Sequence, residues 1–519
     1  MTKQSFLRGT FILILAGLVT RILGFVNRIV MARTLGEEGV GLYMMAVPTF
    51  ILAITLTQLG LPVAIAKLVA EAEAVGDHHK VKKIVTVSLA ITLTLSIILT
   101  GAFIILAPIL SRTLLTDSRT YYPLISILPV VPIIAVSSVL RGYFQGKQNM
   151  KPGSYAQVIE QVVRITLIAF CIQAFLPYGI EYAAAGAMIS AVLGELASLL
   201  YMLVIFKKQK SISIRPQFLQ TVKKSKGTLR SLMSIALPTT GSRFIGSISY
   251  FFEPIVVSQS LAIAGVTAAV ATRQYGELTG YALPLLFLPS FITFALSTSL
   301  VPSISEAMAK KQYRLVEYRL QQAIRLSFIS GGWAVVILYV FAAPILLLMY
   351  NSDHATVFVQ LLAPFCIFYY MQGPLAAVLQ ALDLAKVAMM NSLIGSVVKV
   401  IVIFALASRT EFQIVGVALG IAVGMIAVTF LHFATVLKRI HFTIYIRQYA
   451  YAFLAILISG GVGTYCYRAI TFSPSLALQT LCSIAVTTVI YVFLLIVCGL
   501  IRKDELLRLP ILRKLSFLK

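Results

Sequence analysis

Long apolar stretches separated by short polar segments run along the whole chain. A helix needs about 20 mainly apolar residues to cross the hydrocarbon core of a bilayer, and about fourteen stretches approach that length. They lie near residues 11–34, 41–63, 84–107, 123–145, 153–176, 182–206, 231–256, 275–300, 324–349, 357–381, 388–408, 414–437, 448–470 and 478–500. The pattern predicts an all-α polytopic membrane protein with about fourteen transmembrane helices.

The composition of the chain indicates the same class. Of the 519 residues, 59% are hydrophobic and 12% are charged, and the mean hydropathy is +0.93. A soluble globule of this length would lack the polar side chains needed to cover its surface. The five cysteines lie in apolar stretches without a Cys-x-x-Cys or Cys/His spacing, so they imply neither a disulfide framework nor a metal site. We also expect no cofactor.

Positive charges collect at one end of the predicted spans. The basic residues that precede the first span or follow an even-numbered span include Lys3, Arg8, Lys80, Lys82, Lys83, Lys147, Lys151, Lys207, Lys208, Lys310, Lys311, Lys438, Arg439, Arg502 and Lys503. The positive-inside rule then places both termini in the cytoplasm. The net charge of +25 therefore follows mainly from the membrane topology. Because the basic residues border the predicted spans, they suit contact with anionic lipid headgroups and argue against a nucleic-acid partner.

Two halves of the chain share a sequence pattern. Residues 18–30 resemble 239–251, with Arg21 matching Arg243, and residues 59–74 resemble 298–313. Likewise, residues 139–152 resemble 378–390, and residues 183–201 resemble 413–431. Each half has six predicted spans, so the halves run in the same direction. They should be related by an axis along the membrane normal, as in many secondary transporters.

This repeat sets the predicted domain organisation. We expect an N-terminal six-helix lobe at 1–206, a basic cytoplasmic linker at 207–230 and a C-terminal six-helix lobe at 231–440. Two further helices and a basic cytoplasmic tail occupy 441–519. The composition of the linker fits either a surface helix or a flexible tether.

A cation lies near the middle of the first span of each half. The residues that share one helix face are Gly17, Arg21, Gly24 and Arg28 in the first half, and Thr239, Arg243, Gly246 and Tyr250 in the second. A charge at bilayer depth costs from about 3 to more than 10 kcal/mol, so it should face protein or water. Because arginine binds phosphate groups bidentately, we predict that Arg21, Arg28 and Arg243 hold an anionic headgroup in a cavity.

Other charged residues in the predicted spans are candidates for the same cavity. They are Glu160, Arg164, Arg273, Glu277 and Lys399. Two alternatives stay open. In the first, the glutamate and arginine of each pair, which are four residues apart, neutralise each other on their own helix. In the second, Arg28 and Arg273 extend their charged ends to the membrane boundary and bind no ligand. His432, alone in its span, is predicted to be a packed or hydrogen-bonding residue.

Several segments together carry a family resemblance. They are "RGTFILILAGLVTRILGFVNRIVMARTLGEEGVGLYMMAVPTF", "GLPVAIAKLVAEAEA", "VLRGYFQGKQNM", "LPTTGSRFIG", "RQYGELTG" and "ALSTSLVPSISEA". The chain resembles the stage V sporulation protein B family of endospore-forming bacteria, in the polysaccharide-transport branch of the superfamily that also holds multidrug extrusion carriers and MurJ lipid II flippases. The resemblance implies a two-lobed carrier in the plasma membrane that serves synthesis of spore cortex peptidoglycan.

The resemblance to MurJ flippases reaches individual residues. Their first essential arginine matches Arg21, while their second matches Asn27, with Arg28 one position later. Their arginine and glutamate in span 8 resemble Arg273 and Glu277, although the gap here is four residues instead of three. The resemblance therefore adds Asn27 to the candidate substrate-binding residues and leaves the headgroup contacts open.

The predicted function is that of a membrane flippase, not an enzyme. Two lobes would alternate access to a cavity that carries the polar head of a lipid-linked, lipid II-like isoprenoid pyrophosphate across the membrane. The partners expected with it are anionic lipids and enzymes that synthesise cortex peptidoglycan. A multidrug cation antiporter of the same fold, a membrane enzyme and a non-transporting scaffold for cortex-synthesis enzymes are the alternatives.

Overall fold

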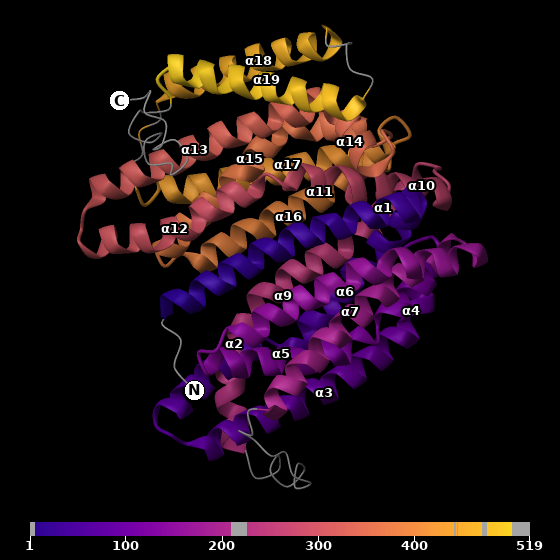
Figure 1. Cartoon of the computed structure of the whole chain (residues 1–519), viewed down its shortest axis with the longest axis vertical. Coiled ribbons are helices and arrows are strands. Elements are labelled where there is room, and N and C mark those ends of the chain that lie inside the picture. Colours follow the sequence, from indigo (N-terminus) through magenta and orange to yellow (C-terminus); the bar gives the residue numbers. More distant parts are fainter. Residues whose placement is uncertain (1–5, 209–225, 441–442, 444, 470–474, 501–519) are drawn as a thin grey trace. The chain divides into compact units, whose positions relative to one another are not determined.

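The computed structural model describes residues 6–208, 226–440, 443, 445–469 and 475–500 (Figure 1). Within these residues every regular element is a helix. The described chain forms two compact units, which we call the N-terminal unit (residues up to 280, with 407–414) and the C-terminal unit (residues 281–406 and from 415 onward). The all-α fold predicted from the hydrophobic pattern is confirmed.

The described residues of the N-terminal unit form nine α-helices and several short helical segments. The helices are α1 (Phe6–Gln58), α2 (Leu61–Ala74), α3 (His78–Ile109), α4 (Tyr121–Ile127), α5 (Val130–Gly146), α6 (Lys151–Phe175), α7 (Ile180–Lys208), α9 (Lys226–Ile263) and α10 (Ala268–Gly276). The short segments are η1 (Leu110–Leu114), η2 (Ser118–Thr120), η3 (Leu176–Tyr178) and η4 (Glu277–Ala282), the last of which runs into the C-terminal unit. One apolar core is shared by α2, α3, α5, α7 and the beginning of α9.

Nine further helices lie among the described residues of the C-terminal unit. They are α11 (Leu283–Phe287), α12 (Ser290–Ala309), α13 (Tyr313–Val340), α14 (Ala342–Tyr350), α15 (Thr356–Ala381), α16 (Ala385–Ala407), α17 (Gln413–Leu437), α18 (Ile446–Ala469) and α19 (Leu476–Val497). Helices α12, α13 and α15 share one core, and α18 and α19 pack on α13 through a second, smaller cluster.

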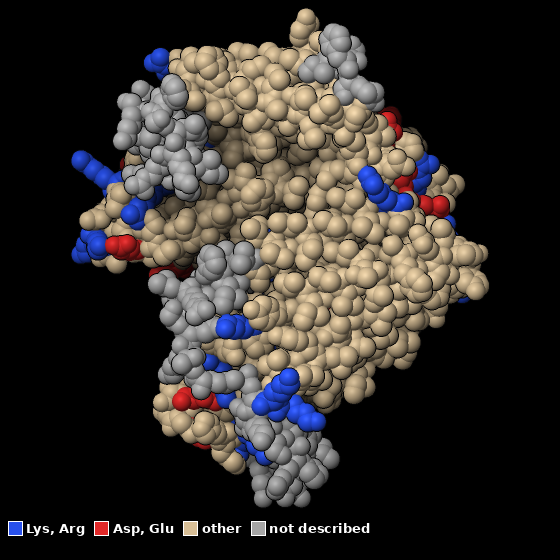
Figure 2. Space-filling view, in the orientation of Figure 1, with Lys and Arg blue, Asp and Glu red and all other residues tan. Residues whose placement is uncertain are grey.

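Twelve helical segments among the described residues are long and apolar enough to cross a membrane. The first, Ala16–Ala74, contains two of the predicted spans, and Gly36 separates them with a left-handed φ of 71°. On the face of each unit shown in Figure 2, the lysine, arginine, aspartate and glutamate side chains lie toward the edges and leave a broad surface of uncharged residues between them. The chain is therefore a multi-pass membrane protein, while the number of fourteen spans stays a prediction.

Two predicted spans are broken where proline interrupts the helix. The span expected at 123–145 is divided into α4 and α5, with Pro129 at the N-cap of α5. The span expected at 275–300 is divided into α10, η4, α11 and α12, with Pro289 at the N-cap of α12. Proline has no backbone N–H and its ring clashes with the preceding turn, which explains both breaks.

The compact units do not follow the boundary of the predicted lobes. Helices α9 and α10 pack against α1 in the N-terminal unit, although the repeat assigns them to the second lobe. The compact units are defined by spatial contacts and the predicted lobes by the sequence repeat. The units therefore do not test the repeat, and the two lobes stay a prediction. Most of the predicted linker and the basic tail, at 209–225 and 501–519, lie outside the described residues.

Candidate functional site

The arginine-bearing face of α1 is open to its surroundings within the N-terminal unit. Arg21 is exposed and Arg28 is half-buried, whereas Asn27 is buried. A Cβ added at Gly17 would meet no atom within 4 Å, and one added at Gly24 would lie 3.9 Å from Gln161 Oε1 on α6. The face predicted from the helical spacing thus carries Arg21 outward, whereas Asn27, which is not part of that face, is buried.

The matching face of α9 belongs to the same unit. Arg243 is exposed, and a Cβ added at Gly246 would meet no atom within 4 Å. Arg28 of α1 lies close enough to the Tyr250 hydroxyl of α9 to act on it electrostatically. The sequence predicts that Arg28 and Tyr250 are equivalent positions of a repeat, and the structure brings these two residues close together.

A cluster of four charged side chains lies between α5, α6 and α7. We call Arg141, Glu160, Arg164 and Glu195 the four-charge cluster. Arg164 Nη2 donates to Glu160 Oε1 at 2.8 Å, which is the pair on one helix that sequence spacing allowed. Arg141 Nη2 donates to Glu195 Oε1 at 3.2 Å and lies 3.7 Å from Glu160 Oε2.

Sequence reasoning missed Arg141. Its partners are on other helices, so no spacing along α5 indicates the pairing. The one available signal was an arginine inside a predicted apolar span, the same signal that singled out Arg21.

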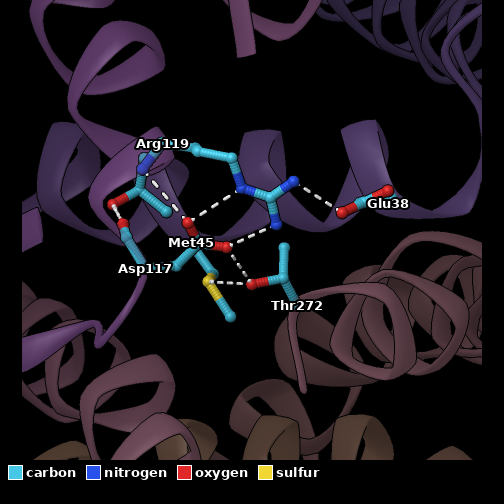
Figure 3. A network of polar contacts seen from close by, with 6 residues as sticks. Glu38, Met45, Asp117, Arg119 and Thr272 are labelled. Carbon is cyan, nitrogen blue, oxygen red and sulfur yellow. Dashed lines mark hydrogen bonds and ion pairs between the residues drawn. The ribbon is translucent and has the colours of Figure 1, made fainter. Parts of the chain in front are cut away.

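A second polar network joins three separate segments of the N-terminal unit (Figure 3). Arg119 of η2 donates to Asp117 at 2.9 Å and to Glu38 of α1 at 2.6 Å. The Thr272 hydroxyl of α10 donates to Asp117 Oδ2 at 2.8 Å and also faces the sulfur of Met45 at 3.8 Å. The network therefore ties α10 to the loop before α4 and to α1, and sequence reasoning did not identify it.

Arg273 lies at the same contact between α10 and α1. Its Nε donates to Glu37 Oε2 of α1 at 3.0 Å and to Glu277 Oε1 at 3.1 Å. The pair four residues apart is therefore present, and Glu37 adds a partner that spacing did not indicate.

Lys399 is the one predicted site residue in the C-terminal unit. It lies half-buried on α16, and a Cβ added at Gly424 of α17 would be 2.9 Å from Lys399 Cβ. His432 is also in this unit, buried, with Nδ1 at 3.3 Å from the Asn391 amide nitrogen. The prediction that His432 packs and hydrogen-bonds inside the bundle is confirmed.

The Asp117 carboxyl should make stability depend on pH at the acid end. Burial raises its pKa, but hydrogen bonds from the Arg119 side chain, from Thr272 and from the Arg119 backbone N–H outweigh burial and hold the pKa below its ordinary 3.8. A carboxyl with a depressed pKa stabilises the fold above its unfolded pKa, and this contribution is lost as the pH falls through the folded value.

We therefore expect the melting temperature of the purified protein in detergent to fall as the pH is lowered from about 5 toward 3, and to fall less in Asp117→Asn. Asp353→Asn, at an exposed carboxylate, is the matched control and should melt like the unsubstituted protein at every pH. Identical acid profiles for Asp117→Asn and the unsubstituted chain would contradict the assignment.

Comparison with known proteins places the chain in a family. The model described as "Polysaccharide biosynthesis protein" matches residues 6–308, and the MatE model matches residues 277–405. The stage V sporulation protein B of Bacillus subtilis (strain 168) is 61% identical over 515 residues, which cover 99% of each chain. The chain belongs to the stage V sporulation protein B family. The resemblance carried by the sequence segments is thereby confirmed.

One more distant relative is named as a lipid II flippase. The lipid II flippase MurJ of Bacillus subtilis is 24% identical over 444 residues, which cover 82% of this chain and 81% of the relative. A solved structure of lipid II flippase MurJ in an inward closed conformation shares the fold, with a TM-score of 0.68 at 15% identity over 93% of this chain and 98% of that one. The chain is thus similar in sequence and in fold to membrane flippases and transporters rather than to enzymes.

Proposed function

We propose that this chain moves a lipid-linked, lipid II-like peptidoglycan precursor outward across the plasma membrane by alternating access, in support of spore cortex synthesis. Both termini would be cytoplasmic, as the distribution of lysine and arginine indicates. The isoprenoid tail would stay in lipid while the diphosphate crosses with the protein.

The observation that carries the proposal is the pair Arg21 and Arg243. Both arginines are exposed, they occupy equivalent positions of the repeat, and glycines beside them leave open space. A guanidinium offers two parallel donors that match phosphate oxygens, and its charge persists at every physiological pH. Arg21, Arg28 and Arg243 are therefore the proposed diphosphate ligands, with Asn27, Arg164, Glu160, Arg273, Glu277 and Lys399 as further candidates.

A basic loop, which the charge distribution predicts to be cytoplasmic, supports the proposal of anionic lipids as partners. The turn between α12 and α13 borders an open hollow of about 520 Å³, lined by Lys311, Gln312, Tyr313, Arg314 and Leu315. Lysine and arginine beside an exposed tyrosine suit the interface of an anionic leaflet.

A binding competition separates this function from cation transport. We expect the purified protein in nanodiscs to bind a fluorescent lipid II analogue, and inorganic pyrophosphate to compete with it. A multidrug cation carrier would need acidic side chains where the repeat places arginine. Saturable binding of a cationic dye, without binding of the lipid II analogue, would contradict the proposed substrate.

A scaffold for cortex-synthesis enzymes makes a different prediction. It requires cytoplasmic loops rather than Arg21 and Arg243, so substituting the loop at 310–314 would abolish function while substituting the two arginines would not. We expect the reverse order of effects when sporulating cells that carry each variant are scored for cortex.

A further inference from the structure

Three segments that connect predicted spans meet at one end of the N-terminal unit (Figure 3). They are the kink of α1 at residues 36–38, the loop before α4 at residues 117–120, and the short helix α10. Each follows an odd-numbered predicted span, so the positive-inside rule predicts that all three lie on the outer side of the membrane. The contacts between them therefore lie at the predicted outer end.

Two polar contacts attach helix α10 to its neighbours in this unit. The Thr272 hydroxyl donates to Asp117 Oδ2 at 2.8 Å, and both side chains are buried. Arg273 Nε donates to Glu37 Oε2 of α1 at 3.0 Å, and the arginine is 48% exposed. We call these two contacts the α10 clasp. Arg119 Nη2 donates to Asp117 at 2.9 Å and so fixes the acceptor that Thr272 uses.

The backbones of α1 and α10 touch directly beneath the clasp. A Cβ added at Gly41 of α1 would lie less than 3.0 Å from Thr272 O, and one added at Gly276 would lie less than 3.0 Å from Glu37 O. Glycine has no side chain to bury, so separating the helices at these positions exposes little apolar surface. The polar contacts of the clasp therefore contribute much of the attachment at this point.

The backbone on either side of α10 departs from a regular helix. Before α10, Gly265 has a left-handed φ of 79°, which glycine adopts at no steric cost. After α10, η4 is a π-helical segment, a rare form that occurs frequently at functional sites. These two segments can absorb a change in backbone angles, so the nine-residue helix α10 is able to move as one body when the clasp is broken.

The clasp also crosses the boundary between the predicted lobes. Helix α10 follows the first span of the predicted second lobe, whereas Glu37 and Asp117 belong to the predicted first lobe. In alternating access, contacts between lobes at one end must break before the cavity opens there. The clasp suits this step, because hydrogen bonds and partly exposed ion pairs can be exchanged for bonds to water at modest cost.

We propose that the α10 clasp holds the protein closed at the predicted outer end and that it opens in each transport cycle. This inference rests on the alternating-access function proposed above. It assigns Asp117, Thr272 and Arg273 to the opening step, and it predicts that the resting protein is closed on its outer side.

A reversible lock tests whether the clasp must open. Asp117→Cys combined with Thr272→Cys, in a chain whose five native cysteines are replaced by alanine, puts two thiols where the hydrogen-bonding oxygens lie 2.8 Å apart. We expect oxidation to lower the flipping of fluorescent lipid II in vesicles to the protein-free rate, and reduction to restore it. Each single cysteine variant is a control and should not respond to oxidation. Equal flipping by the fully cross-linked and the reduced protein would overturn the proposal.

A distance measurement tests the clasp without any cargo. Spin labels at Ser118 and Ala269, which are both exposed, report how far α10 lies from the loop before α4 in nanodiscs. Thr272→Val combined with Arg273→Gln removes both contacts of the clasp. Each lost hydrogen bond to a charged group should shift the equilibrium toward the open form by about 10-fold, so we expect a second, longer distance to appear. Arg112→Gln, at an exposed arginine of η1, is the control and should keep the original distance.

A single variant keeps the distance measurement decisive. Should the double variant fail to give monodisperse protein, Arg273→Gln alone is expected to show the longer distance in a smaller fraction of molecules. A distance distribution identical to that of the unsubstituted protein, in whichever of these variants is monodisperse, would overturn the proposal.

The outcome is separable from the proposed function. If the reduced protein flips the precursor and cross-linking does not change the rate, the inference about the clasp fails and the flippase proposal stands. If removing the clasp produces the longer distance but no form of the protein moves the precursor, the clasp stands and the flippase proposal fails.

Discussion

Arg21→Ala and Arg243→Ala are each expected to lower the rate of precursor flipping by about 10- to 100-fold. A hydrogen bond to a charged group contributes about 1.5–3 kcal/mol, and each 1.4 kcal/mol corresponds to a factor of ten. Both side chains are exposed, so their removal should cost little folding stability. The measurement is the initial rate of flipping in vesicles that contain equal amounts of each variant.

Two matched substitutions define what these arginines do. Arg21→Lys keeps the positive charge but loses the planar fork, so we expect a rate between those of the unsubstituted protein and Arg21→Ala. Arg112→Ala removes an exposed arginine of η1, away from both arginine faces, and should leave the rate unchanged. Full activity of Arg21→Ala and Arg243→Ala would contradict their role as diphosphate ligands.

Gly41→Ala and Gly276→Ala should be the most destabilising single substitutions that we predict. An added Cβ would lie less than 3.0 Å from Thr272 O in the first case, and less than 3.0 Å from Glu37 O and Gly41 N in the second. These are backbone atoms, which cannot swing away as a flexible side chain can. Helices α1 and α10 would have to separate, and the contacts of Thr272 with Asp117 and of Arg273 with Glu37 would be strained.

We expect each of these alanine variants to lose about 3 kcal/mol of stability or more, at the upper end of the range for overpacked sites. The loss would appear as a lower melting temperature and less monodisperse protein in detergent. Gly101→Ala in α3 is the control, because its added Cβ meets no atom within 4 Å and alanine is the better helix former. Melting of Gly41→Ala and Gly276→Ala at the unsubstituted temperature would show that α1 and α10 do not approach as described.

The helical architecture could be predicted because hydrophobicity is a local property of the sequence. Stretches of about 20 apolar residues identify helices regardless of what packs on them. The helix breaks at Pro129 and Pro289 also have a local cause, since proline lacks a backbone N–H. They were missed because the apolar stretch continues through each proline.

Partners on different helices could not be predicted in the same way. The pairs Glu160–Arg164 and Arg273–Glu277 follow from a spacing of four residues. Arg141–Glu195 and Asp117–Thr272 join residues 54 and 155 positions apart, so they depend on which helices pack together. Sequence therefore identified the exposed arginine faces of α1 and α9 but missed the polar contacts that fix the helices around them.

The most direct test of the account is flipping by the purified protein in vesicles that contain fluorescent lipid II. Exposure of the label on the outer leaflet should rise faster in these vesicles than in protein-free vesicles, and an imposed potential should change the rate because the headgroup is anionic. Exposure at the protein-free rate, with and without the potential, would contradict the claim that this family member moves a lipid-linked precursor.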